Sequence, residues 1–155
     1  GRWQPAPMAT SRTTSVTSMS GIAQILVHDR EAGLSPSVLE RILGSIAEAG
    51  ISLDMFSIAP DRIAFTLDGE QLAETEVVLA PLELDLQLRR HCAKITLVGG
   101  GIHGIPGIMH RVVATLACKG IAILQSVDSN TIISVLIDGA REEDAVHALH
   151  EEFFG

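Results

Sequence analysis

The sequence predicts an α+β protein made of two tandem βαββαβ units, each an antiparallel sheet with helices on one face. Three observations support this fold class. Apolar residues alternate with a period of two in some segments and recur with a helical period in others. Glycine, proline and Asp-Gly pairs separate these segments. The pattern then repeats about seventy positions later in the chain of 155 residues.

The composition allows a large aliphatic core and excludes several functions. Hydrophobic residues make up 46% of the chain, whereas aromatic residues make up 3%. The net charge of −8 argues against nucleic-acid or anionic-membrane partners, which require a basic patch. Two cysteines, Cys92 and Cys118, are too few for a disulfide framework, and no apolar run reaches the ~20 residues of a membrane span. We therefore expect a cytoplasmic protein with reduced thiols.

The first unit is expected at residues 21–90. Residues 1–20 precede it and show no regular period, which predicts a linker or disordered tail. Ser35 is a plausible N-cap with Pro36 at the first helical position, and Gly50 ends that helix. A second, acidic helix is expected at 70–79. The expected strands are 22–28, 51–58, 62–67 and a half-buried fourth strand at 84–88, where leucines alternate with polar residues.

The second unit, residues 91–155, repeats the first in register. Pro36 recurs as Pro106, Arg41 as Arg111, Gly50-Ile51 as Gly120-Ile121 and Asp68-Gly69 as Asp138-Gly139. The copy stops after a helix at 142–153, so its last strand is short, missing or supplied from elsewhere. Each unit is a ferredoxin-like sandwich, whose open sheet face and edges need cover. We therefore expect a homodimer.

A glycine-rich turn in the second unit predicts an anion site. It connects an apolar strand to a helix, so backbone N–H groups and the positive end of the helix dipole converge there. Gly99, Gly101 and Gly104 spell G-x-G-x-x-G, and a dinucleotide-binding oxidoreductase fragment is therefore an alternative. Against it, Pro106 at the first helical position leaves the third glycine in the turn, and too few residues follow for a Rossmann half-sheet.

Other reactive side chains form no recognisable catalytic or metal set. His103, His110, His147 and His150 lack the further ligands that a zinc site needs. No catalytic residue, metal or cofactor is therefore expected. What remains is a binding site present in each copy, with a helix start for a carboxylate. Acidic residues that could hold an ammonium by charge-assisted hydrogen bonds are Asp29, Glu31 and Asp54. This pairing of charges describes an amino-acid site.

These features resemble the tandem ACT domains of the C-terminal regulatory region of aspartate kinases. The resemblance covers about residues 15–154. It is most specific in Cys92–Ile95, Val98–Gly101, Gly104–Gly107, Ile123–Thr131 and the ending Ala145–Phe153. The Leu-Gln-Ser-x-Asp-Ser form at 124–129 is similar to that of the diaminopimelate-sensitive aspartokinases of spore-forming bacteria.

The resemblance implies feedback inhibition by an aspartate-family end product, meso-diaminopimelate or lysine, and a homodimer formed through the ACT domains. It also implies an aspartate kinase catalytic domain or subunit as partner, because the family's Lys-Phe-Gly-Gly catalytic motif is absent from this sequence. The first loop is acidic and lacks the family's usual Pro-Gly, so a structural dimerisation module without ligand remains an alternative.

The effector residues that the resemblance implies belong to three segments. The first ACT domain supplies the loop after its first strand and the start of its second strand. These residues are His28, Asp29, Glu31, Gly33, Leu34, Ser35, Ile51, Ser52, Leu53 and Asp54. The other ACT domain contributes Gln125, Ser126, Val127, Asp128, Ser129, Asn130 and Thr131. A second possible effector loop consists of Gly101, Ile102, His103, Gly104, Ile105, Pro106 and Gly107.

Overall fold

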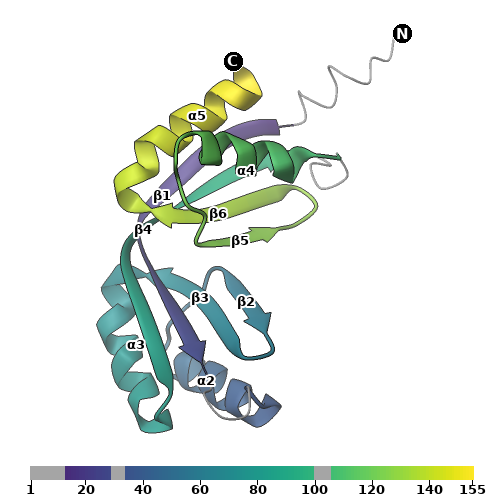
Figure 1. The fold of residues 1–155 in the computed structure, drawn as a ribbon. Coiled ribbons are helices and arrows are strands. Elements are labelled where there is room, and N and C mark those ends of the chain that lie inside the picture. Colours follow the sequence, from purple (N-terminus) through teal and green to yellow (C-terminus); the bar gives the residue numbers. More distant parts are fainter. Residues whose placement is uncertain (1–12, 29–33, 100–105) are drawn as a thin grey trace. The chain divides into compact units, whose positions relative to one another are not determined.

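The computed structural model describes residues 13–28, 34–99 and 106–155 (Figure 1). Helices and strands follow one another in the βαββαβ order that the sequence predicts, with short 3-10 turns before α3 and α5 and after α3. The elements are β1 (Thr13–His28), α2 (Pro36–Glu48), β2 (Phe56–Ala59), β3 (Arg62–Asp68), α3 (Leu72–Leu79), β4 (Asp85–Gly99), α4 (Ile108–Cys118), β5 (Gln125–Asp128), β6 (Ile132–Asp138) and α5 (Glu142–Phe154).

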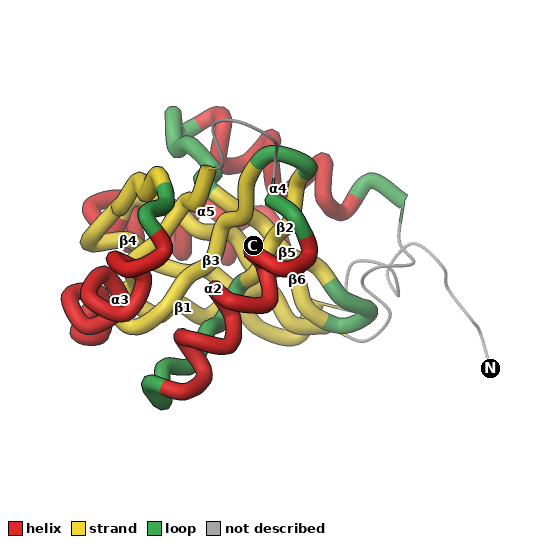
Figure 2. Tube along the Cα trace, turned by 90° about the horizontal axis from the view of Figure 1, so that it is seen from below, coloured by secondary structure: helices red, strands yellow, loops and turns green. Residues whose placement is uncertain are grey.

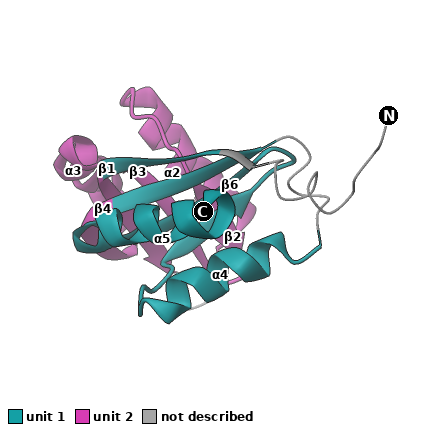
Figure 3. Ribbon diagram, turned by 90° about the horizontal axis from the view of Figure 1, so that it is seen from above, with its two compact units in different colours: residues 1–20, 93–155 teal, residues 21–92 magenta. Residues whose placement is uncertain are grey.

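The chain divides into two compact units (Figure 3). Unit 2 is the continuous segment Gly21–Cys92, and unit 1 combines the described residues of 1–20 with those of 93–155. The strand order is β2-β3-β1-β4 in unit 2 and β1-β4-β6-β5 in unit 1, because β1 and β4 each contribute one half to each unit. Both orders are those of a ferredoxin-like βαββαβ sandwich.

The strand pairs repeat with the seventy-residue spacing of the sequence. Phe56 lies opposite Phe65 in the β2–β3 pair, and Ser126 lies opposite Val135 in the β5–β6 pair. Both pairs are antiparallel. An antiparallel sheet cannot form half of a Rossmann fold, whose strands are parallel. The dinucleotide-binding alternative is therefore wrong.

Each unit has its own aliphatic core between its helices and one face of its strands (Figure 2). In unit 2 the buried side chains Ile25 and Phe65 of the sheet pack with Ile42 and Ile46 of α2. In unit 1 the corresponding cluster joins β4 and β6 to α4 and α5. The two cores share the same register because the apolar positions of the two repeats coincide.

Several local sequence predictions are confirmed. Ser35 is the N-cap of α2, with Pro36 at the first helical position, and Gly50 follows the helix with a left-handed φ of 74°. The fourth strand of unit 2 forms in the first half of β4. Its alternating leucines, Leu84, Leu86 and Leu88, pack on the unit 2 core.

The first half of β1 corrects the expectation of a disordered tail at residues 1–20. Residues 13–20 form a strand that serves as the fourth strand of unit 1, which the C-terminal repeat does not itself supply. Residues 1–12 lie outside the described residues. The sequence pattern does not reveal this strand because the segment is rich in Ser and Thr, and among the described side chains of residues 15–20 Val16 is the apolar one that packs on the unit 1 core.

Two element boundaries also differ from the expected ones. β2 begins at Phe56 because Asp54 and Met55 both oppose the single residue Thr66, as in a β-bulge. The helix α4 begins at Ile108, two residues after Pro106. Gly107, which precedes the helix, has a left-handed φ of 81°. Pro106 therefore lies outside α4.

Candidate effector site

The loop end of unit 2 is formed by the end of β1, the start of α2 and the turn between β2 and β3. His28 ends β1 and lies opposite Arg62, which is also the partner of Ala59 in β2. Leu34 and Ser35 precede α2. Three of the expected site residues, Asp29, Glu31 and Gly33, lie outside the described residues.

Ser35 prepares the N-terminus of α2 structurally. Its hydroxyl oxygen accepts a hydrogen bond from the Val38 N–H at 3.3 Å, and a 3.2 Å hydrogen bond joins it to the Ser37 hydroxyl. An N-cap of this kind satisfies one of the N–H groups that a helix leaves without an intrahelical partner. The same helix end carries the positive end of the dipole and favours a nearby carboxylate.

The expected residues Ile51–Asp54 are not brought to this loop end within unit 2. The Asp54 N–H donates to the Thr66 carbonyl at 2.9 Å, and Thr66 lies four residues along β3 from Arg62. At ~3.3 Å per residue these positions are about 13 Å apart. The separation follows from topology: α2 returns the chain to the far end of the sheet before β2 begins. Ser52 and Asp54 are exposed there, whereas Ile51 is buried.

In unit 1, the end of the sheet that corresponds to this loop end brings together two of the expected segments, the polar turn after β5 and the end of β4. The Gly99 N–H, at the end of β4, donates to the Thr131 carbonyl at 2.8 Å. The Ser129 N–H donates to the Ile132 carbonyl at 2.8 Å and closes the turn between β5 and β6. The exposed residues Asp128, Ser129, Asn130 and Thr131 therefore lie next to the end of β4, from which the glycine-rich loop continues.

The remaining residues of these two segments have different environments. Gln125 is 8% exposed and pairs with Leu136, three residues along β5 from Asp128. Ser126 is exposed and Val127 is half-buried. Pro106 and Gly107 form the exposed turn before α4, whereas residues 101–105 of the second loop lie outside the described residues.

Sequence reasoning missed the β2–β3 turn of unit 2. The seventy-residue repeat maps Asp128–Thr131 onto Ile58–Asp61, so the turn beside His28 corresponds to the turn beside Gly99. Asp61 and Arg62 are exposed in it. The repeat was the signal that could have identified these residues, because it relates every position of one turn to a position of the other.

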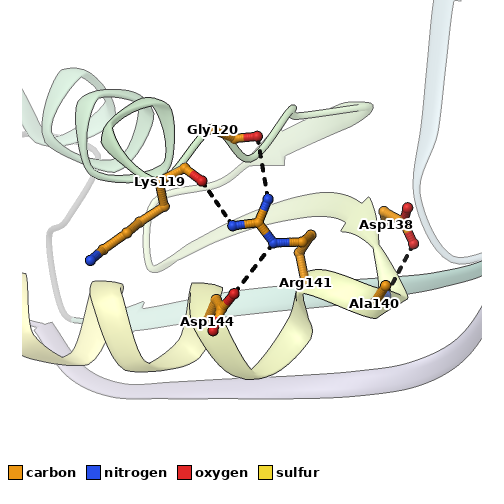
Figure 4. A network of polar contacts seen from close by, with 6 residues as sticks. All are labelled: Lys119, Gly120, Asp138, Ala140, Arg141 and Asp144. Atoms are coloured by element: carbon orange, nitrogen blue, oxygen red, sulfur yellow. Dashed lines mark hydrogen bonds and ion pairs between the residues drawn. The ribbon is translucent and has the colours of Figure 1, made fainter.

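The C-terminal end of α4 is fixed by Arg141 (Figure 4). Its guanidinium donates to the Lys119 carbonyl at 2.8 Å and to the Gly120 carbonyl at 3.5 Å, and it lies 3.4 Å from the Asp144 carboxylate. These carbonyls belong to the end of the helix, where carbonyl groups lack intrahelical partners. Arg141 thus holds the connection that leads from α4 into β5 and its polar turn.

Comparisons with known proteins give consistent matches. An ACT domain family model matches residues 87–151. Aspartokinase 1 of Bacillus subtilis is 41% identical over 117 residues, which cover 76% of this chain and 29% of that protein. The aspartokinase of Geobacillus stearothermophilus is 34% identical over 118 residues, covering 72% of this chain and 29% of that protein.

Solved structures extend the match over both units. The regulatory subunit of aspartate kinase from Thermus flavus superposes with a TM-score of 0.85 and 26% identity, covering 92% of this chain and 99% of that one. The chain belongs to the aspartokinase regulatory regions. A structure of aspartokinase alpha and beta subunits matches this aspartokinase region with a TM-score of 0.83 and 27% identity, covering 91% and 98% of the two chains.

This aspartokinase region spans about 29% of the length of the two curated relatives described above. Across the described ranges 13–28, 34–99 and 106–155, no group of three or more His, Cys, Asp or Glu side chains could hold a metal ion. In the same part of the chain, no helix is long and apolar enough to cross a membrane.

Proposed function

We propose that this regulatory region binds an aspartate-family amino acid, meso-diaminopimelate or lysine, and transmits feedback inhibition to an aspartate kinase catalytic domain or subunit in the cytoplasm. The observation that carries the proposal is the 2.8 Å hydrogen bond between the Gly99 N–H and the Thr131 carbonyl. It places a polar, acidic turn at the strand end from which the glycine-rich loop leads to α4.

The chemistry of this end suits a zwitterion. The N-terminus of α4 favours a carboxylate, because its first N–H groups lack intrahelical partners and its dipole is positive there. The exposed carboxylate of Asp128 supplies a partner for an ammonium group. Unit 2 repeats the arrangement with the N-terminus of α2 and Asp61. The Gln-Ser-Val-Asp-Ser form at 125–129 is the feature that favours diaminopimelate.

The expected site residues 51–54 can belong to the proposed site if the protein forms a homodimer. Ile51–Asp54 lie at the opposite end of the strands from His28, so we propose that they contact an effector held by a unit of the second copy. Two exposed apolar side chains support pairing: Leu43 of α2 is 37% exposed and its repeat equivalent, Val113 of α4, is 43% exposed. The outer strands of the sheet, β2 and β5, are available for the same contact.

The catalytic partner is proposed from the similarity to the aspartokinase composed of alpha and beta subunits. We propose that this region acts on a separate or covalently linked kinase domain. Co-expression with an aspartokinase catalytic polypeptide, followed by an aspartate phosphorylation assay, tests this directly. Inhibition by diaminopimelate or lysine supports the proposal, and a rate that neither compound changes contradicts it.

Ligand binding is tested by thermal unfolding with each aspartate-family amino acid, diaminopimelate and NAD. A ligand at a hundred times its Kd stabilises the folded state by about 2.7 kcal/mol, which for a protein of this size raises Tm by about 5–10 °C. We expect this shift with diaminopimelate or lysine and none with NAD. Absence of a shift with every amino acid, in a protein that sediments as a dimer, would instead support a purely structural module.

Two matched variants assign the site. Asp128→Asn removes the proposed ammonium partner in unit 1, and Asp61→Asn removes the acidic residue of the corresponding turn in unit 2, at the position equivalent to Thr131. Glu48→Gln, at the exposed end of α2, serves as a neutral control. The variant that weakens binding identifies the unit that holds the effector, and unchanged affinity in both variants would rule out these turns as the ammonium site.

A further inference from the structure

The N-terminal half of β1 is the fourth strand of unit 1, and the first half of β4 is the fourth strand of unit 2. Because β1 and β4 pair with one another in both units, the seventy-residue repeat relates the two fourth strands residue by residue. Val16 corresponds to Leu86, and Ser18 corresponds to Leu88. The two strands occupy equivalent places but present different side chains to their cores.

The two fourth strands are held with unequal amounts of apolar packing. In unit 2, Leu84, Leu86 and Leu88 all pack on the core. In unit 1, Val16 is the one side chain of residues 15–20 that packs on the core, and Ser18 is exposed. Since burial of leucine side chains stabilises the strand that carries them, the fourth strand of unit 1 is held more weakly than its counterpart in unit 2.

An open surface pocket lies beside Ser18, and four of its six lining residues, Glu142, Glu143, His147 and His150 of α5, are charged or polar. The pocket has a volume of about 510 Å³ and lies between Ser18 of β1 and one side of α5. Val146 of α5 contributes its apolar wall, and Val146 also packs on the unit 1 core. The space is thus next to the core and is bordered by a serine at the position that Leu88 occupies in unit 2.

The weakly held strand ends at a backbone position suited to a hinge. Gly21 follows Ser20 directly, has a φ of 70°, and is the first residue of unit 2. Within the described part of the chain, no heavy atom other than those of its chain neighbours would lie within 4 Å of a Cβ at this position. Beyond the hinge, Ile22, Ala23 and Ile25 are buried, so the second half of β1 is anchored independently.

We propose that residues 13–20 form a latch strand, which opens from unit 1 about Gly21 while the rest of both units stays folded. Opening exposes the edge of β4 over Ala93–Gly99, with the unpaired N–H and C=O groups that accept an added extended strand. The latch strand also connects residues 1–12 to unit 1.

Hydrogen exchange measured by mass spectrometry on the intact chain tests the latch. The amides of residues 15–20 are expected to exchange at least tenfold faster than those of 22–28 and of 86–90. Equal protection of the two halves of β1 would overturn the proposal, because it would mean that the strand opens only when the whole fold unfolds.

A reciprocal pair of variants tests the cause. Ser18→Leu introduces the apolar side chain found at the equivalent position of unit 2 and is expected to slow exchange at residues 15–20 by roughly tenfold. Leu88→Ser creates the same defect in unit 2 and is expected to speed exchange at 86–90. If Ser18→Leu folds and leaves exchange at 15–20 unchanged, the packing explanation is wrong. Leu88→Ser tests the same explanation independently, since unchanged exchange at 86–90 would also contradict it.

Discussion

Gly21 and His91 lie seventy positions apart and share a left-handed backbone, with φ of 70° and 57°. Each stands in the middle of a long strand, β1 or β4, at the point where that strand passes from one unit to the other. The repeat has therefore preserved a backbone conformation at a position where one copy carries glycine and the other a histidine. A histidine in this region is strained relative to glycine.

This strain predicts the effect of substitutions at the two positions. His91→Gly is expected to raise the free energy of unfolding by about 0.5–1 kcal/mol, because the exposed imidazole loses no packing when removed. Gly21→Ala is expected to lower it by about 1 kcal/mol, although space for the methyl group exists. Urea unfolding of the two variants measures both. A destabilised His91→Gly protein would show that the side chain contributes more than its backbone costs.

Two other glycines are expected to respond oppositely to alanine. Gly44 lies within α2 with open space around its added Cβ, so Gly44→Ala should stabilise the protein by about 0.5–1 kcal/mol. A Cβ on Gly69 would lie 2.9 Å from the Gly21 carbonyl oxygen, so Gly69→Ala should destabilise it by about 1–3 kcal/mol. Chemical denaturation compares them, and effects of the same sign would contradict the assigned geometry.

Arg141 is expected to stabilise the junction between α4 and β5. Its repeat equivalent is Gln71, so Arg141→Gln substitutes the residue of the other copy and removes the hydrogen bond to the Lys119 carbonyl. We expect a loss of about 1 kcal/mol and faster amide exchange near residues 119–121. Arg62→Gln, at an exposed position of β3, is the control. Equal effects of both variants would indicate a general charge effect rather than capping.

The ion pair between α4 and α5 is expected to contribute modestly. Arg111 Nε donates to a Glu152 carboxylate oxygen at 2.8 Å, and its guanidinium lies 4.4 Å from the centre of the Phe153 ring. Both charged side chains are about one-third exposed, at 34% and 38%. A double-mutant cycle with Arg111→Ala and Glu152→Ala should give a coupling of about 0.5–1 kcal/mol that decreases with added salt. A coupling that salt leaves unchanged would contradict solvent screening of the pair.

The sequence predicted those elements whose stability comes from regular apolar spacing. The alternation of Leu84, Leu86 and Leu88 predicted a strand, and the helical recurrence after Pro36 predicted α2. Prediction from the sequence failed where hydrogen bonds, rather than apolar contacts, determine the backbone conformation. Residues 13–20 have little apolar character, and the bulge at Met55 depends on the Thr66 hydroxyl, which accepts from the Met55 N–H at 2.9 Å.

The candidate site was predicted in part for a different physical reason. The family resemblance implied residues 128–131, and glycine content identified the turn that follows Gly99; the structure places Thr131 beside Gly99 through a backbone hydrogen bond. Their composition carries no information about which end of the sheet a residue occupies. The end of the sheet at which a residue lies follows from the direction of its strand. Strand direction places Asp54 at the end away from His28 and places Arg62 opposite His28.

The interruption of unit 1 by unit 2 has a consequence for synthesis on the ribosome. Residues 13–20 are made before their partner, residues 93–99, which follows some seventy residues later; making that stretch takes about 4–15 s at ordinary rates of translation. Unit 2 is continuous in the chain and is completed at Cys92, directly before this partner segment is made. Because residues 13–20 are rich in Ser and Thr, a nascent chain that still lacks their partner strand exposes little apolar surface in this segment.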